Sequence, residues 1–144
     1  MTDKKTAEMK DRKAILSTLW AFVTVNYLYC DVMALMDPTI LKQFMAGYAG
    51  GFRITQGFLL GAALLMEIPM AMILLSRVLK HGANRRANII AGIIMTAVQI
   101  ASLFAGTSTL YYRFFSIIEI GCTSLIVWFA WKWSNPRDSQ TTQN

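Results

Sequence analysis

The chain alternates between long apolar stretches and short polar connections. Four of the apolar stretches are long enough to cross a hydrocarbon core of about 30 Å, which takes about 20 helical residues. They run over residues 14–36, 54–79, 87–105 and 110–133. The sequence therefore predicts an all-α membrane protein with one four-helix transmembrane domain over residues 14–133.

The connections between these spans differ in length. Short links join the second span to the third and the third to the fourth, which predicts antiparallel neighbours in a compact four-helix bundle. The first connection is longer. In it Asp37 can cap a helix, Pro38 can take the first helical position, and the glycines between 47 and 51 can end it. We therefore expect a short outer interfacial helix between spans one and two.

Composition agrees with a membrane protein. Of the 144 residues, 55% are hydrophobic and 15% are charged, and the mean hydropathy is +0.42, which lies outside the soluble range. The formal net charge is +6, but a nucleic-acid footprint gathers on one folded face, whereas these basic residues bracket apolar segments. The expected partner is the lipid bilayer, and no nucleic acid.

The basic residues also predict an orientation. Eleven of the fourteen Lys and Arg residues lie in the N-terminal tail, in the connection between spans two and three, or at the C-terminus. The remaining three, Lys42, Arg53 and Arg113, lie on the other side. Short Lys- and Arg-rich loops stay in the cytoplasm. We expect a multi-pass protein of the inner (plasma) membrane with both termini cytoplasmic (N-in/C-in), a basic tail over 1–13 and a disordered polar tail over 134–144.

Three acids lie at membrane depth: Asp31, Glu67 and Glu119. A charged side chain at a helix centre costs upwards of about 2.5 to 3.5 kcal/mol, so each acid calls for a partner or a water-lined cavity. Glu67 also precedes Pro69, which frees a backbone carbonyl one turn earlier and can kink the span. Three acids at similar depths favour an outward-facing pocket for a proton, a cation or a cationic small molecule.

Helical phase indicates which residues can line such a pocket. At 100° per residue, each span carries one stripe of polar or small side chains, and packing the four stripes together would enclose a hydrated space. Arg113 can pair with Asp31 or Glu119, or extend to the outer headgroups. The candidate ligand-binding residues are Trp20, Asn26, Tyr27, Asp31, Glu67, Gln99, Arg113 and Glu119.

A structural role is the alternative. Polar side chains commonly join transmembrane helices at under about 2 kcal/mol each, so the polar seam can instead belong to a scaffold or accessory subunit. Enzyme chemistry is disfavoured, because there is no nucleophile with a base and no phosphate loop. Cys30 and Cys122 form no CxxC, and His81 is expected in a polar loop, so we expect no metal or cofactor. A single thin bundle favours a homo-oligomer for any continuous pathway.

The resemblance to a known family lies in two stretches of the chain, "LSTLWAFVTVNYLYCDVMALMDP" and "EIPMAMILLSRVLKHGANRRANIIAGII". They resemble a family of small bacterial integral membrane proteins with four predicted spans, catalogued as a domain of unknown function. The resemblance runs from Leu16 to about Ile94 and is less distinctive in the fourth span. It implies the four-helix layout and matches family signatures to Leu19-Trp20, Asn26, Asp31 and Glu67-Ile68-Pro69, without assigning them a role.

Overall fold

The computed structural model describes residues 2–105 and 109–133. Within them the chain forms five helices and two very short strands: α1 (Thr2–Met36), α2 (Pro38–Met45), β1 (Tyr48–Ala49), β2 (Phe52–Arg53), α3 (Gln56–Val78), α4 (His81–Phe104) and α5 (Leu110–Trp131). The helices α1, α3, α4 and α5 are long and apolar enough to cross a membrane. The predicted all-α architecture with four apolar spans is confirmed. The predicted tail over 134–144 lies outside the described residues.

Two helices begin earlier than the hydropathy pattern predicts. The helix α1 is continuous from Thr2, through the segment assigned to the basic tail, and α4 begins at His81. Polarity marks where a span leaves an apolar environment, but Lys, Arg and Glu are good helix formers, so they do not end the helix. Glu8 and Arg12 form an ion pair of 3.5 Å one turn apart. The expectation of His81 in a loop is therefore wrong.

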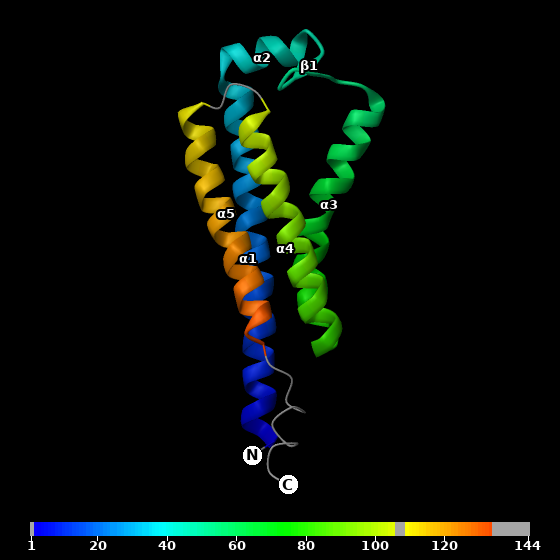
Figure 1. The fold of residues 1–144 in the computed structure, drawn as a ribbon, viewed down its shortest axis with the longest axis vertical. Coiled ribbons are helices and arrows are strands. Elements are labelled where there is room, and N and C mark those ends of the chain that lie inside the picture. The colour runs from blue at the N-terminus through cyan, green and yellow to red at the C-terminus, as the bar shows by residue number, and fades with distance from the viewer. Residues whose placement is uncertain (1, 106–108, 134–144) are drawn as a thin grey trace.

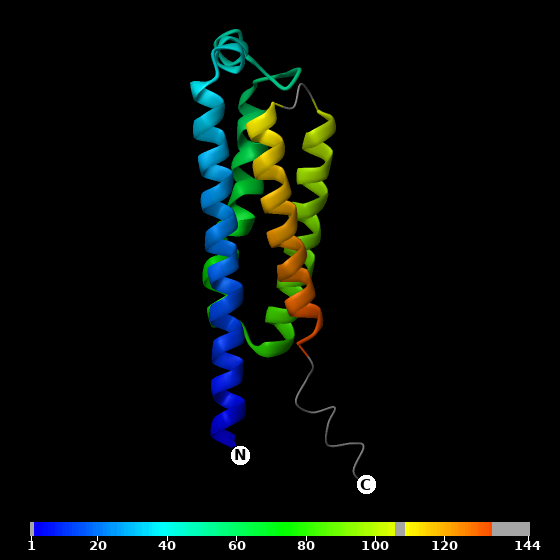
Figure 2. The same ribbon diagram turned by 90° about the vertical axis from the view of Figure 1, so that its left-hand side faces the viewer.

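The four long helices form a ring. The helix α1 packs against α3 and α5, while α4 packs along α5 and over a shorter stretch against α3. Figures 1 and 2 show that α1 begins and α5 ends at one end of the molecule, whereas α2 lies across the opposite end. We call these the terminal end and the α2 end.

The helix α2 forms where the sequence predicts a short helix. Asp37 is its N-cap, and Asp37 Oδ1 accepts hydrogen bonds from the backbone N–H groups of Thr39 at 2.9 Å and Ile40 at 3.4 Å. Pro38 occupies the first helical position, where its missing N–H costs nothing. The antiparallel hairpin β1–β2 follows and turns through Gly50 and Gly51, both at positive φ. This segment connects α1 to α3 across the α2 end.

The helix α3 packs into the bundle along only part of its length. Its buried residues are Pro69, Met72 and Ser76, all in the half nearer the terminal end, whereas every residue from 56 to 64 is exposed. Figure 1 shows α3 diverging from α4 toward the α2 end. Pro69 lies inside the helix and cannot donate to the carbonyl of Leu65. The bundle is therefore closed toward the terminal end and open between α3 and α4 toward the α2 end.

The packed core joins α1, α4 and α5. Trp20, Val23 and Ile126 are fully buried in it. Gly92 brings α4 close to α5, because a Cβ at this position would lie 2.6 Å from Val127 Cγ2. Close helix approach through a small residue is typical of membrane bundles.

Candidate functional site

Toward the terminal end, buried polar side chains of α1, α3 and α4 form a closed hydrogen-bond network. Trp20 Nε1 and Ser76 Oγ both donate to Asn88 Oδ1, at 2.7 and 3.2 Å. Asn88 Nδ2 donates to Asn84 Oδ1 at 2.6 Å, and Asn84 Nδ2 donates to the carbonyl of Ser76. All four residues have 0% exposure. Because each polar group has a partner, this network joins helices and leaves little capacity for a ligand.

A second set of hydrogen bonds joins α4 to α5. Gln99 Nε2 donates to Ser116 Oγ at 2.8 Å, and Thr96 Oγ1 donates to Thr123 Oγ1 at 2.7 Å. Gln99 was a candidate ligand residue, and the structure places its amide in this seam. Hydrogen bonds of this kind between transmembrane helices are ordinary packing interactions.

Tyr27 and Glu119 differ from these satisfied groups. Both are buried, at 6% and 1% exposure, yet among the described residues Tyr27 OH and Glu119 Oε1 have no hydrogen-bond partner. Each lies nine residues from the α2 end of its helix, since α1 ends at Met36 and α5 begins at Leu110. At 1.5 Å per residue both therefore lie about 13 Å inside that end. A buried acceptor without a partner costs about 1 to 3 kcal/mol, which makes this pair the centre of the candidate site.

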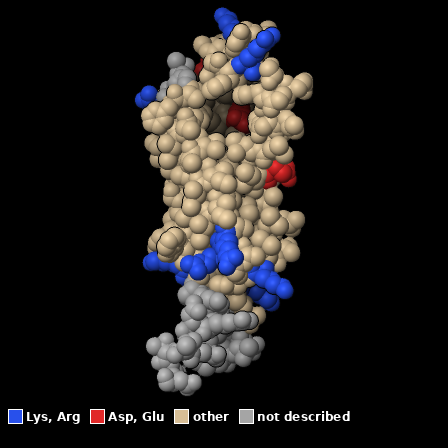
Figure 3. All heavy atoms as spheres, turned by 45° about the vertical axis from the view of Figure 1, so that its right-hand side comes forward, with Lys and Arg blue, Asp and Glu red and all other residues tan. Residues whose placement is uncertain are grey.

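Asp31 lies one helical turn closer to the α2 end than Tyr27. It is exposed, and its charge lies close enough to Glu119 and to Cys30 to interact with both. Figure 3 shows a hollow in the side of the molecule near the α2 end, with an acidic side chain inside it. We call the group formed by Tyr27, Asp31 and Glu119 the acidic pocket. Two of the three predicted acids thus come together with a predicted aromatic residue.

The structure does not bring Glu67 to the acidic pocket. The stripe of polar and small side chains on α3, formed by Gln56, Leu60, Ala63, Glu67 and Met70, is exposed along its whole length. The expectation that this stripe faces the other three is therefore wrong. Periodicity shows which residues share a face, but the packed face of α3 is instead the one that carries Met72 and Ser76.

Three further candidates lie outside the pocket. Trp20 belongs to the terminal network, where its indole N–H is used. Asn26 is half-buried, and its Nδ2 donates to the carbonyl of Phe22 in the preceding turn at 2.9 Å. Arg113 is exposed in the first turn of α5. Sequence reasoning missed Asn84, although its spacing of four from Asn88 places both amides on one helical face.

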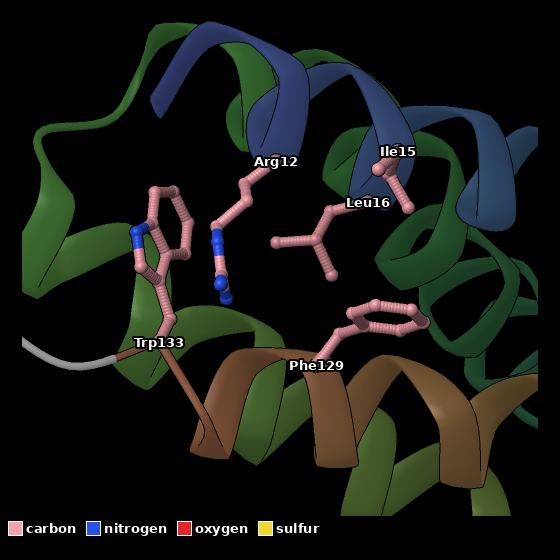
Figure 4. A pocket seen from close by; sticks show the side chains of 5 residues that line it. All are labelled: Arg12, Ile15, Leu16, Phe129 and Trp133. Atoms are coloured by element: carbon pink, nitrogen blue, oxygen red, sulfur yellow. The ribbon is translucent and has the colours of Figure 1, made fainter. Parts of the chain in front are cut away.

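Two other concavities are less suited to a polar ligand. A cavity of about 10 Å³ at the terminal end has room for no more than about one water molecule. Figure 4 shows the side chains around it: Arg12, Ile15, Leu16, Phe129 and Trp133. An open groove along α4 and α5 is lined by Ile93, Thr96, Ala97, Ile100, Ser124 and Val127. The hydroxyl of Thr96 in this groove already donates a hydrogen bond to Thr123 Oγ1.

The chemistry available in the acidic pocket is that of two carboxyl groups and a phenol. Cys30 and Cys122 are buried and free. Across residues 2–105 and 109–133 no group of three or more His, Cys, Asp or Glu side chains is arranged to hold a metal ion. Carboxylate and phenol oxygens can accept hydrogen bonds from a cation or exchange a proton.

The sequence matches a family of unknown function (DUF6326) over residues 4–140, so the chain belongs to that family. Neither a curated protein nor a solved structure matches it.

Proposed function

We propose that this four-span member of a family without an assigned activity binds a small organic cation, of the protonated-amine class, in the acidic pocket. The observation that carries the proposal is the buried and unpartnered Glu119 Oε1 beside the equally buried Tyr27 OH, with Asp31 within electrostatic reach. Glu119 is the principal anion, Asp31 attracts the ligand at the entrance, and Tyr27 supplies an oxygen and an aromatic face.

The number of oxygen donors favours an organic cation over a hard metal ion. Calcium takes six to eight oxygen ligands, whereas the side chains of Tyr27, Asp31 and Glu119 together supply five oxygens. An ammonium group donates up to three hydrogen bonds, which carboxyl and phenol oxygens can accept.

Access to the pocket follows from the divergence of α3. Because α3 leaves α4 toward the α2 end, the hollow opens through the side of the bundle (Figure 3). In the orientation expected from the basic residues, the bundle is antiparallel in the plasma (inner) membrane, both termini are cytoplasmic and α2 is outside. The ligand then enters from the outer leaflet or the outer aqueous side, and transport would require a second, inward-open arrangement.

The proposal is tested by binding measurements on the purified protein in nanodiscs, with benzylammonium and phenethylammonium as probe cations. Glu119→Gln removes the principal anion and should weaken binding at least tenfold. Asp31→Asn should weaken it less, because this carboxyl is exposed. The matched control is Glu67→Gln, a neutralised acid outside the pocket, which should bind as the wild type does. Equal affinity of Glu119→Gln and the wild type would contradict the proposal.

A structural scaffold is the second candidate. The saturated network around Asn88 favours it, because this part of the bundle is built for packing alone. A scaffold role predicts that Glu119→Gln changes thermal stability in detergent without changing probe binding. The same variant therefore separates the two functions.

A further inference from the structure

Glu67 occupies an unusual place for an acid. It is the midpoint of α3, eleven positions after Gln56 and eleven before Val78, and it is exposed. The helix is apolar enough to cross a membrane. Ionisable residues inside a span are strongly disfavoured in contact with lipid and almost always face protein or a water-filled cavity. Glu67 therefore requires a neighbouring surface that shields its carboxyl group from lipid.

Its own bundle lies on the other side of α3. At 100° per residue, Ser76 points about 180° away from Glu67, and Met72 about 140° away. These are the residues that α3 buries. The nearest basic residue along the helix, Arg77, is ten positions away and donates its Nε to Ser17 Oγ of α1 at 3.1 Å. The surface that shields Glu67 must therefore come from another molecule.

The exposed side of α3 forms one continuous stripe. Its members lie within about 40° of a line along the helix and are all exposed: Gln56, Leu60, Ala63, Glu67, Met70 and Leu74. From Gln56 to Leu74 the stripe is about 27 Å long at 1.5 Å per residue. Its polar members are Gln56 and Glu67, and Ala63 provides a small residue one turn from Glu67. We call this the Glu67 stripe.

We propose that the Glu67 stripe is the contact surface for a second copy of this chain, with the two α3 helices parallel and Glu67 beside its counterpart. A two-fold interface places identical residues at equal depth, so its polar groups must be self-complementary. A protonated carboxyl and an amide each carry a donor and an acceptor, so Glu67 and Gln56 can each pair with their own copy. Ala63 lets the two backbones approach closely.

This inference is independent of the proposed cation site. The Glu67 stripe lies on the side of α3 opposite its packed face, and none of its residues belongs to the acidic pocket. A failure of cation binding therefore leaves it intact, and the reverse also holds.

Cysteine cross-linking tests the contact. In full-length protein with Cys30→Ala and Cys122→Ala, Ala63→Cys introduces a thiol into the stripe. The matched control, Ala97→Cys, introduces one at an exposed alanine of α4. Under oxidation in dilute liposomes, we expect a disulfide-linked dimer from Ala63→Cys and monomer from Ala97→Cys. Monomer from both variants, or equal dimer from both, overturns the proposal.

Substitution of Glu67 tests its role in the pairing. The dimer fraction is measured by single-molecule photobleaching of labelled protein in liposomes. Glu67→Gln keeps a self-complementary group and should dimerise within threefold of the wild type, whereas Glu67→Lys places two ammonium groups together and should weaken association at least tenfold. Wild-type protein that remains monomeric, or dimerisation of Glu67→Lys equal to the wild type, overturns the proposal. If Glu67→Lys does not fold, the cross-linking result decides.

Discussion

The two halves of the bundle use similar polar side chains in opposite ways. Toward the terminal end, Asn84, Asn88 and Ser76 are fully buried and hydrogen-bonded to one another. Toward the α2 end, Tyr27 and Glu119 are just as deeply placed, but polar atoms of both lack a partner among the described residues. Burial alone therefore does not distinguish a structural polar group from a candidate binding group. The difference is whether its hydrogen bonds are already made.

Helix packing differs in the same direction. The helix α3 buries Met72 and Ser76 in one half and no residue between 56 and 64 in the other. The saturated Asn88 network thus lies in the packed half, whereas the two unpartnered polar atoms that belong to buried residues, Tyr27 OH and Glu119 Oε1, lie in the open half. This correspondence predicts that stability resides mainly in the terminal half and ligand binding in the α2 half.

The largest effect is expected at Asn88. Asn88→Ala removes the acceptor of Trp20 Nε1 and Ser76 Oγ together with the donor to Asn84, so it should lower the free energy of unfolding by about 3 kcal/mol. The measurement is SDS-induced unfolding in mixed micelles. Asn26→Ala is the control, since the hydrogen bond that the structure shows for Asn26 is to the carbonyl of Phe22 in the same helix. Similar losses of unfolding free energy in both variants would contradict the proposed difference between the two halves.

A pair of truncations on α3 tests the packing difference directly. Met72 is 4% exposed and Leu64 is 63% exposed. Met72→Ala should cost about 2 kcal/mol because it leaves a cavity in the packed half. Leu64→Ala should cost under about 0.5 kcal/mol. Both are measured by the same unfolding assay. A large loss for Leu64→Ala would mean that α3 closes against the bundle.

Unlike the substitutions above, Glu119→Leu should raise the free energy of unfolding. Replacing an unpartnered buried carboxyl with an apolar side chain of similar size removes a desolvation cost, so we expect stabilisation by about 1 kcal/mol and loss of probe binding. Gln99→Leu is the matched control, because it deletes an existing bond to Ser116 and should destabilise. Thermal unfolding in detergent compares the two. Equal destabilisation would assign Glu119 to the structural network.

The smallest effect is expected in the α4–α5 seam. Thr96→Val keeps the shape of the side chain but deletes its hydrogen bond to Thr123. Interhelical hydrogen bonds in membranes average about 0.6 kcal/mol, so the free energy of unfolding should fall by about that amount. SDS unfolding measures this change, and a loss above 2 kcal/mol would indicate that the seam is as critical as Asn88.

The sequence predicts where the helices of this fold lie better than it predicts which face of each helix turns inward. Span length and hydropathy are properties of each segment, and the cap at Asp37 is a local interaction, so these features could be predicted. Which face of a helix turns inward depends on its neighbours. The polar stripe of α5, which contains Glu119, faces the inside of the bundle, whereas the polar stripe of α3, which contains Glu67, faces outward. The two stripes have the same helical period, so periodicity does not distinguish them. Asn84 was missed for a related reason: Arg85 and Arg86 follow it directly, which placed it outside the predicted span.

The length of α1 has a consequence for the membrane surface at the terminal end. The twelve residue-to-residue steps from Thr2 to Ala14 correspond to about 18 Å of continuous helix. Electrostatic screening in physiological salt acts over about 8 Å. If α1 enters a membrane near Ala14, Arg12 and Lys13 at the base of this arm lie within that distance of the headgroups, whereas Glu8, about 9 Å further out, lies beyond it. The base of the arm is therefore suited to contact with a charged surface, and its outer turns are too far from such a surface to sense it.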